Sequence, residues 1–226
     1  MTNIGKLFIV PTPIGNLDDI TYRAIETLKN VDLVLAEDTR KSKILFKKHA
    51  ITTSLKSYHI NNEHRVVNLY VASLVDGKKI ALVSDAGTPS ISDPGFLLIR
   101  ESIKKNIEII CLPGATALIP ALVMSGLPSE KFVFEGFLPK KKGRDSRLKE
   151  LAIEKRTVIL YESPLRVIKT LQDLKEFFGS DRRISLSREI SKIYEETYRG
   201  TIEDAIAHLS NKNPKGEFVI CIDKLG

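Results

Sequence analysis

Short apolar runs alternate with longer amphipathic segments through the first half of the chain. The short runs, such as 31–36 and 79–83, are rich in β-branched residues, which is typical of strands. The longer segments, such as 18–30, place apolar residues at helical spacing. This alternation predicts βαβ units and a parallel sheet. The expected strands are 6–10, 31–36, 55–58, 79–83 and 107–112, and the expected helices are 18–30, 39–49, 63–75 and 96–104.

The pattern breaks between residues 113 and 128, where an apolar helix at 115–124 is closed by Gly126. Beyond it, crossover and hairpin-like connections are mixed, which predicts a mixed sheet. Ser163 with Pro164 is typical of a helix start, and Thr201 with Asp204 of a helix cap. We expect an α/β protein with an N-terminal domain over 1–117 and a C-terminal domain over 118–226. The later elements expected are strands at 132–134, 157–161, 184–187, 194–199 and 217–222, and helices at 148–153, 164–178 and 202–209.

Composition favours an ordinary globular protein. Of the 226 residues, 42% are hydrophobic and 28% are charged, which argues against disorder. No apolar run approaches the roughly 18 residues of a membrane span, and the run at 7–10 is too short for a signal-peptide core. We therefore expect a cytoplasmic protein without a membrane partner. The net charge of +7 raises the expectation of a polyanionic partner.

Several common catalytic motifs are absent from the sequence. There is no glycine-rich dinucleotide fingerprint after a strand, no Walker A motif and no serine nucleophile elbow. The four histidines and two cysteines have no zinc-ligand spacing, so we expect no metal. Cys111 and Cys221 each lie in an apolar run, and we expect both to be small buried residues on strands. A disulfide or a metal pair is the alternative.

Four polar loops follow expected strands directly, at 11–16, 37–40, 84–89 and 113–117. In open parallel sheets, ligands bind just beyond the carboxyl ends of the strands. Three of these loops carry Gly and Pro, which allow sharp turns or a close approach to a ligand. Each loop alone fits ordinary turn chemistry. Four at one edge of a sheet predict a polar small-molecule site.

These loops and several later segments resemble one family. The resembling segments are 11–17, 36–40, Tyr58-His59 with Asn62-Glu63, 84–95, 112–116, 135–139, 161–164 and 216–218. They are similar to the ribosomal RNA small subunit methyltransferase I group, the 16S rRNA cytidine 2′-O-methyltransferases of the tetrapyrrole-methylase superfamily. The resemblance runs in order through nearly the whole chain, and the 85–95 segment is its most specific part.

The resemblance implies a two-domain tetrapyrrole-methylase-like fold. Its N-terminal domain holds a parallel sheet with helices, its C-terminal domain a mixed sheet with helices, and the cofactor lies in the interdomain cleft. It also implies S-adenosylmethionine-dependent 2′-O-methylation of a cytidine ribose in the decoding centre of 16S rRNA, with the small ribosomal subunit as partner and a homodimer as the working form. Many members carry a further segment after the last strand, so we expect any RNA contact made there to be absent or replaced.

The resemblance also carries over a set of cofactor-binding residues. Gly87 lets the backbone approach the ligand, and free N–H groups at Thr116 and Ala117 open the apolar helix. The superfamily usually has Asp where this chain has Thr88, so a carboxylate contact is not expected there unless Asp85 supplies it. The implied set is Pro13, Ile14, Asp85, Ala86, Gly87, Thr88, Ile91, Thr116, Ala117, Tyr161, Gly216 and Glu217.

A ribose hydroxyl is a weak acid, so a base or a stabilising charge helps its reaction. His59 is a less favoured base, since a lone histidine is more often structural. The alternative for the 37–40 segment is a capped helix start, with Asp38 as the cap and Arg40 in solvent. The catalytic candidates are Glu37, Asp38, Arg40, Arg188 and Glu189.

Five of the eight residues at 140–147 are basic. We expect an exposed, mobile loop that tracks RNA phosphates, and the alternative is a solvated run of charge. The RNA-binding candidates are Lys140, Lys141, Lys142, Arg144 and Arg147. Two other functions stay open: a tetrapyrrole (precorrin-type) methyltransferase, and a non-catalytic RNA-binding protein of ribosome assembly.

Overall fold

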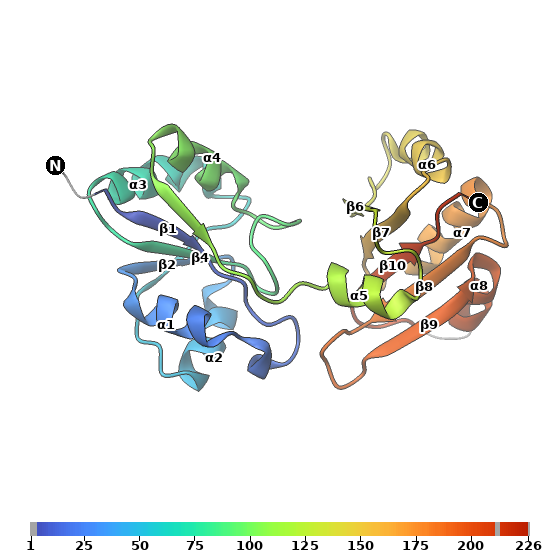
Figure 1. Cartoon of the computed structure of the whole chain (residues 1–226), viewed down its shortest axis with the longest axis horizontal. Helices are drawn as coiled ribbons and strands as arrows, with labels where there is room; N and C mark the ends of the chain where they lie inside the picture. The colour runs from blue at the N-terminus through green and yellow to red at the C-terminus, as the bar shows by residue number, and fades with distance from the viewer. Residues whose placement is uncertain (1–3, 211–212, 226) are drawn as a thin grey trace. The chain divides into compact units, whose positions relative to one another are not determined.

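The computed structural model describes residues 4–210 and 213–225. Contacts between Cα atoms divide the chain into two compact units, Met1–Thr116 and Ala117–Gly226. The division falls one residue before the domain boundary expected from the sequence. Each unit is built around a sheet of its own (Figure 1).

Unit 1 contains a five-stranded sheet in the order β3-β2-β4-β1-β5. All of its strand pairs are parallel, as the alternating pattern predicted. Parallel strands run in one direction, so their carboxyl ends meet at the same edge of the sheet. The strands are β1 (Lys6–Ile9), β2 (Leu33–Ala36), β3 (Leu55–Ser57), β4 (Ile80–Val83) and β5 (Glu108–Cys111).

Helices cover both faces of this sheet (Figure 1). Successive side chains on a strand point to opposite faces. Val34 therefore packs with Leu28 and Phe46 in one core cluster, while the next residue, Leu35, packs with Leu74 in the other. The helices are α1 (Tyr22–Asn30), α2 (Thr39–Lys48), α3 (Glu63–Val75) and α4 (Phe96–Lys104), with a short 3₁₀ turn at Leu17–Asp19.

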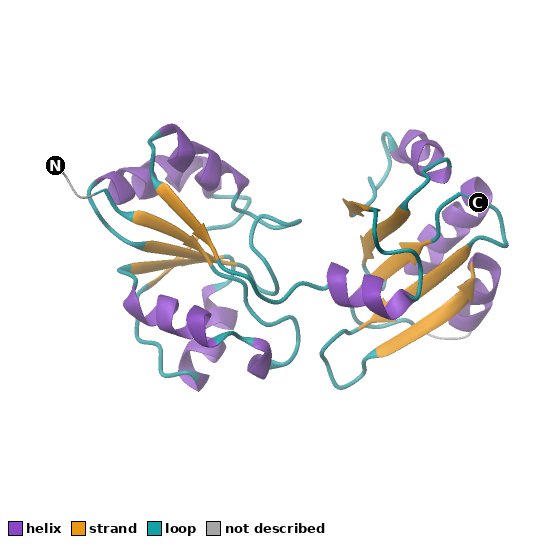
Figure 2. Cartoon of the chain, in the orientation of Figure 1, coloured by secondary structure: helices purple, strands orange, loops and turns teal. Residues whose placement is uncertain are grey.

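Unit 2 contains a mixed sheet in the order β6-β7-β10-β8-β9, as expected (Figure 2). Strands β6 and β7 are parallel, and the other three pairs are antiparallel. Leucines of α6 and α7 pack with the strands in one apolar core. The strands are β6 (Phe132–Gly136), β7 (Thr157–Glu162), β8 (Arg183–Arg188), β9 (Glu196–Thr201) and β10 (Phe218–Ile222), and the helices are α5 (Leu118–Ser125), α6 (Arg144–Ala152), α7 (Val167–Phe178) and α8 (Ile202–Ser210).

Two helix ends that the sequence predicted are confirmed. The Asp204 N–H donates to the Thr201 hydroxyl at 3.1 Å, and the Thr201 N–H donates to the Asp204 carboxylate at 3.3 Å. This reciprocal pair is a capping box at the start of α8. Gly126 ends α5 in the left-handed conformation with φ of 70°, which glycine adopts without steric cost.

Four helix starts were wrong. The helix expected at 115–124 begins at Leu118, and the helix expected at 148–153 begins at Arg144. The helix expected from residue 18 begins at Tyr22, because the Thr21 hydroxyl accepts the Ala24 N–H and caps it there. The helix expected from Pro164, with Ser163 as its cap, begins at Val167 instead. The Ser163 N–H donates to a side-chain oxygen of Glu162, and residues 164–166 form a turn before the helix, with the Arg166 N–H donating to the Ser163 carbonyl.

The two cysteines differ. Cys221 is buried as expected, and burial raises the pKa of its thiol to about 12. The expected burial of Cys111 was wrong, because its strand β5 lies at the edge of the sheet and leaves this side chain exposed. Both thiols are free. Within residues 4–210 and 213–225, no helix combines the length and apolarity needed to cross a bilayer.

Candidate active site

The loops after β1 and β4 join at the carboxyl edge of the unit 1 sheet. Thr12 and Gly87 exchange two backbone hydrogen bonds, of 2.9 and 2.8 Å. The Thr12 hydroxyl donates to the carbonyl of Ser84 at 3.0 Å, and the Ser84 hydroxyl donates to the carbonyl of Gly87 at 3.0 Å. Both hydroxyl-bearing side chains are buried. The two loops therefore form one rigid piece, although they lie about 70 residues apart in sequence.

The loop after β5 joins the same piece. The Thr88 hydroxyl donates to the carbonyl of Ala115 at 3.1 Å. Gly114 packs so closely on Pro11 that a Cβ atom there would lie 2.6 Å from the proline Cβ. Only glycine fits at that position. Three of the four loops expected at this edge are thus held together by backbone groups, hydroxyls and one obligatory glycine.

Gly87, in the loop after β4, faces the loops after β1 and β5 and has φ of 82°. A Cβ atom built there would lie 3.4 Å from a methyl group of Ile14 and 3.7 Å from the Ala115 carbonyl. The missing side chain leaves a small open cradle lined by two loops. Of the cofactor candidates, Pro13, Ile14, Asp85, Ala86, Gly87, Thr88, Ile91 and Thr116 lie in unit 1, and Ala117, Tyr161, Gly216 and Glu217 lie in unit 2.

The fourth loop, after β2, is tied to the β4 loop through Asp85. One carboxylate oxygen of Asp85 accepts the Asp38 N–H at 2.9 Å, and the other accepts the Lys41 ammonium at 2.8 Å. Asp38 itself accepts the Arg40 N–H at 2.8 Å and so caps α2. Hydrogen bonds from the Arg40 guanidinium and backbone hold the pKa of Asp38 far below its usual range. The alternative of a capped helix start therefore describes Asp38 correctly, and such a carboxylate is a weak base.

Glu37 stands beside this cluster in a different electrostatic state. Burial, and then the nearby Asp85 carboxylate, raise the pKa of Glu37, against the weaker opposing effects of Lys41 and His59. The Nδ1 atom of His59 is buried and has no hydrogen-bond partner within the described part of the chain. A carboxylate with a raised pKa holds a proton more readily than Asp38 does. Glu37 is therefore the stronger candidate base of the two.

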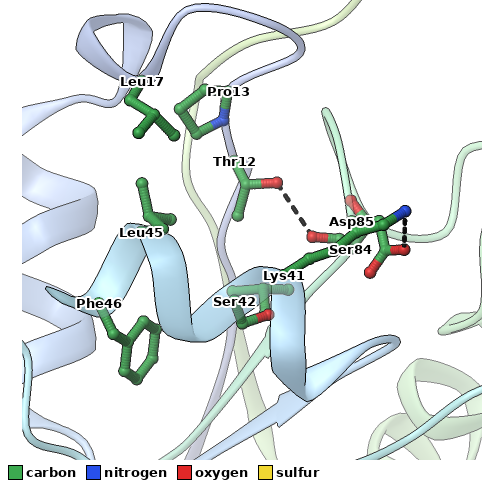
Figure 3. Close-up of a pocket in the computed structure, with 10 residues that line it drawn as sticks. Thr12, Pro13, Leu17, Lys41, Ser42, Leu45, Phe46, Ser84 and Asp85 are labelled. Atoms are coloured by element: carbon green, nitrogen blue, oxygen red, sulfur yellow. Dashed lines mark hydrogen bonds and ion pairs between the residues drawn. The ribbon is translucent and has the colours of Figure 1, made fainter. Parts of the chain in front are cut away.

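A small cavity of about 60 Å³ lies next to this cluster, between α2 and the loop after β1 (Figure 3). Lys41 and Asp85 stand on one side of it, and Leu17 and Leu45 stand on the other. Small-molecule sites usually enclose about 300–1,000 Å³, so the cavity alone cannot hold a nucleotide-sized ligand. Its lining residues are Thr12, Pro13, Leu17, Lys41, Ser42, Leu45, Phe46, Val83, Ser84 and Asp85.

Three polar residues of this edge were not among the sequence candidates. Thr12 and Ser84 join the loops, and Lys41 neutralises Asp85. For Thr12 and Ser84 the available signal was a hydroxyl at the first turn of a loop that follows a strand. Lys41 gave no signal beyond its place in the first turn of a helix after an acidic segment.

In unit 2, four candidates come together at the ends of β8 and β10. Glu189 and Glu217 are joined by two hydrogen bonds of 3.0 Å, and Lys192 lies 2.7 and 3.0 Å from their carboxylates. A Cβ atom at Gly216 would overlap the Glu189 side chain. Burial alone would raise the pKa of Glu189, but Lys192, the Glu217 N–H and Arg188 outweigh it and lower that pKa. Glu189 is thus a structural carboxylate in this arrangement.

Comparison with known proteins identifies the family of this chain. The model for tetrapyrrole (corrin/porphyrin) methylases matches residues 6–206. A ribosomal RNA small subunit methyltransferase I from Synechocystis is 51% identical over 97% of this chain and 79% of its own length. The protein of that name from Thermotoga maritima is 46% identical over 97% of this chain and 98% of its own length. This chain belongs to the ribosomal RNA small subunit methyltransferase I family. The resemblance read from the sequence is confirmed, and with it the assignment of the chain as a methyltransferase.

Solved structures confirm the fold of this family member. Uroporphyrin-III C-methyltransferase from Thermus thermophilus, solved with S-adenyl homocysteine, is 17% identical. It aligns with a TM-score of 0.68 over 96% of this chain and 97% of that chain. At this identity the likeness shows the tetrapyrrole-methylase fold alone.

The basic run of this methyltransferase divides into two groups. Lys140, Lys141 and Lys142, which we call the lysine run, are exposed as expected. The expectation of an exposed loop was wrong for Arg144, which is 5% exposed and starts α6. Its guanidinium is used inside the protein, 2.7 Å from Asp173, so it is not available to a phosphate. Arg147 also lies on α6, where carboxylates of β6 and α6 pair with it.

Proposed function

We propose that this protein transfers a methyl group from S-adenosylmethionine to the 2′-hydroxyl of a cytidine in the 16S rRNA of the small ribosomal subunit. The observation that carries the proposal is the 51% and 46% identity to two proteins named ribosomal RNA small subunit methyltransferase I, over 97% of this chain. The decoding centre, as the location of that cytidine, comes from the family resemblance of the sequence.

The joined loops of unit 1 fit the chemistry of this cofactor. S-adenosylmethionine supplies an electrophilic sulfonium methyl group when it is bound. Backbone groups and neutral hydroxyls bind a nucleoside without adding charge beside a sulfonium, and the cradle at Gly87 leaves room for a close approach. A protein of the same fold was solved with S-adenyl homocysteine, the cofactor without its methyl group. We assign cofactor binding to the unit 1 candidates from Pro13 to Thr116. The family resemblance is the support for the candidates Ala117, Tyr161, Gly216 and Glu217.

Glu37 is the base in this proposal. Its raised pKa makes the carboxylate a better proton acceptor at neutral pH than Asp38 or Glu189, whose pKa values are lowered. General bases of this kind contribute about 10²–10⁴-fold to a rate. Glu37 accepts the proton of the ribose hydroxyl, and Lys41 limits the repulsion between Glu37 and Asp85. Arg40 and Arg188 remain candidates for stabilising the developing alkoxide, and Arg40 also for holding an RNA phosphate.

The RNA partner is bound by the lysine run. Lysines neutralise phosphates without reading base sequence, and the three side chains are exposed on one short segment. Arg147 is held by carboxylates and Arg144 is buried, so neither is counted in this surface. The proposal also includes a cytoplasmic location, where ribosomal subunits are found, and a homodimer, which light scattering on the purified protein would test.

The test is methyl transfer from labelled S-adenosylmethionine to three substrates side by side: small ribosomal subunits, naked 16S rRNA and a precorrin-type tetrapyrrole. The proposal expects label in the rRNA of at least one RNA substrate and none in the tetrapyrrole. Label in the tetrapyrrole alone would overturn it. Absence of label from all three, with intact cofactor binding, would favour a non-catalytic assembly protein.

A further inference from the structure

Strand β7 ends at a buried carboxylate, Glu162, whose side chain is 1% exposed. One of its oxygens accepts the Ser163 N–H at 2.8 Å, and the other accepts the Thr170 hydroxyl at 2.7 Å. The guanidinium of Arg166 lies 3.6 Å from it. A buried charge is costly unless its oxygens are satisfied. Glu162 is therefore fixed, and it fixes the first turns of α7 in relation to the sheet.

Arg144 extends this network to the start of α6. Its guanidinium donates to the Thr170 hydroxyl at 2.9 Å, to the Asp173 carboxylate at 2.7 Å and to the Pro139 carbonyl at 3.0 Å. Thr170 thus accepts from Arg144 while it donates to Glu162. One buried hydroxyl, 0% exposed, connects the two charged groups.

Two arginines of this network hold consecutive carbonyl groups of one loop. Arg166 donates to the Leu138 carbonyl and Arg144 to the Pro139 carbonyl, each at 3.0 Å. These carbonyls directly precede the lysine run. On its far side, the Arg144 N–H donates to the Lys141 carbonyl at 3.1 Å and closes a turn. The lysine run is therefore anchored at both ends, although its side chains are exposed.

We propose that Glu162, Thr170, Arg144 and Arg166 form an arginine clamp that presets the lysine run for RNA phosphates. These are positioning residues, since they act through the loop and not on the RNA. A flexible loop loses conformational freedom when it binds, and an anchored one avoids much of that cost. The inference rests on the proposed function, in which the lysine run contacts rRNA.

The test uses Thr170→Val, which removes the connecting hydroxyl and changes no charge. Thr157→Val is the matched control, because Thr157 is also 0% exposed in unit 2 and its hydroxyl also donates to a carbonyl, that of Pro128, at 2.6 Å. Affinity for small ribosomal subunits should fall about threefold to tenfold in Thr170→Val, as for other coupled networks. It should stay unchanged in Thr157→Val at a similar loss of thermal stability.

Two further readouts separate positioning from general destabilisation. The slope of affinity against salt should stay that of the parent, because Thr170→Val removes no phosphate contact. Hydrogen exchange at the amide of Arg144 should accelerate in Thr170→Val and not in the control. Affinity for S-adenosylmethionine should be equal in all three proteins.

Parental affinity for small subunits in a folded Thr170→Val would overturn the clamp. If that variant does not fold, Arg166→Lys replaces it, since it keeps the charge but loses the guanidinium Nη2 that donates to the Leu138 carbonyl and pairs with Glu162. Parental affinity in Arg166→Lys would be equally decisive. A parent protein that binds small subunits but neither methylates them nor naked rRNA defeats the proposed function, whereas an active parent with an unaffected Thr170→Val defeats the clamp alone.

Discussion

Three of the loops at the carboxyl edge of unit 1 and the β6–α6 loop of unit 2 are held by different chemistry. In unit 1, the loops after β1, β4 and β5 are joined by backbone pairs, two hydroxyls and a close-packed glycine. In unit 2, the arginine clamp and the Arg147 pair with Glu135 hold the loop through charge-assisted bonds. Such bonds are stronger than neutral ones. A neutral frame suits a cofactor that must be approached by backbone, and a charged frame suits a loop that must stay in place while it binds a polyanion.

The largest effect should come from breaking the neutral frame at Gly87. In Gly87→Val, a β-branched side chain would occupy the cradle between Ile14 and Ala115, and we expect no detectable binding of S-adenosylmethionine by calorimetry. Gly126→Val is the control, because that glycine also has positive φ, of 70°, but has no atom within 4 Å of an added Cβ. Both carry similar backbone strain. Unchanged cofactor affinity in Gly87→Val would show that Gly87 serves the turn alone.

Next in size is the loss of the base. Glu37→Gln should lower the rate of methyl transfer by about 10²–10⁴-fold, with cofactor affinity unchanged. In the parent, the rate should fall as the pH drops through the raised pKa of Glu37, at a higher pH than the usual value of about 4.3. That limb of the pH–rate profile should be missing from the residual activity of the variant. A parental rate in Glu37→Gln would remove Glu37 from the mechanism.

Although Glu37→Gln should lower the rate of methyl transfer, it should raise the stability of the protein at neutral pH. A carboxyl whose pKa is raised by folding stabilises the protein at low pH, and this contribution is lost as the pH rises through that pKa. Glutamine carries no charge at any pH, so Glu37→Gln should have a higher Tm than the parent at neutral pH. Thermal melts at acid and neutral pH would check this, and a lower Tm at neutral pH would contradict it.

Much of the arrangement of these loops could be predicted from the sequence, but not all of it. The strand-following loops were predictable because period and turn residues mark them, and so was the capping role of Asp38. The burial of Arg144 could not be predicted, since nothing in a run of basic residues indicates which side chain is buried against Asp173 and Thr170. Those partners lie almost thirty residues further on. The same limit applies to Lys41 and Asp85, whose pairing depends on the order of strands in the sheet.

Removing Arg144 from the arginine clamp should lower the free energy of unfolding more than it lowers the rate of methyl transfer. Arg144→Ala leaves the half-buried Asp173 carboxylate without its ion-pair partner and the Thr170 hydroxyl without one of its two partners. Loss of a hydrogen bond to a charged group costs about 1.5–3 kcal/mol. Denaturant unfolding would measure the loss. Lys142→Ala, on the same segment but exposed, should change the unfolding free energy by less than about 0.5 kcal/mol. Equal effects in the two variants would contradict the buried role of Arg144.

The smallest effect on stability is expected from replacing the lysine run, which should change mainly the salt dependence of RNA binding. Replacing Lys140, Lys141 and Lys142 with Ala should remove roughly one unit per lysine from the log–log slope of small-subunit affinity against salt. The control replaces three exposed lysines that lie near the amino ends of β4 and β5, which are Lys78, Lys79 and Lys105. That control should keep the parental slope, since it has the same net charge but leaves the loop intact. Equal slopes in both triple variants would assign the salt dependence to net charge.

The most direct test of the proposed function is nucleoside mass spectrometry on 16S rRNA after incubation of small ribosomal subunits with the protein and S-adenosylmethionine. We expect one new 2′-O-methylcytidine with the parent protein, and a much slower appearance of the same nucleoside with Glu37→Gln. A methyl group found on a base, or 2′-O-methylcytidine formed at equal rates by both proteins, would contradict this expectation.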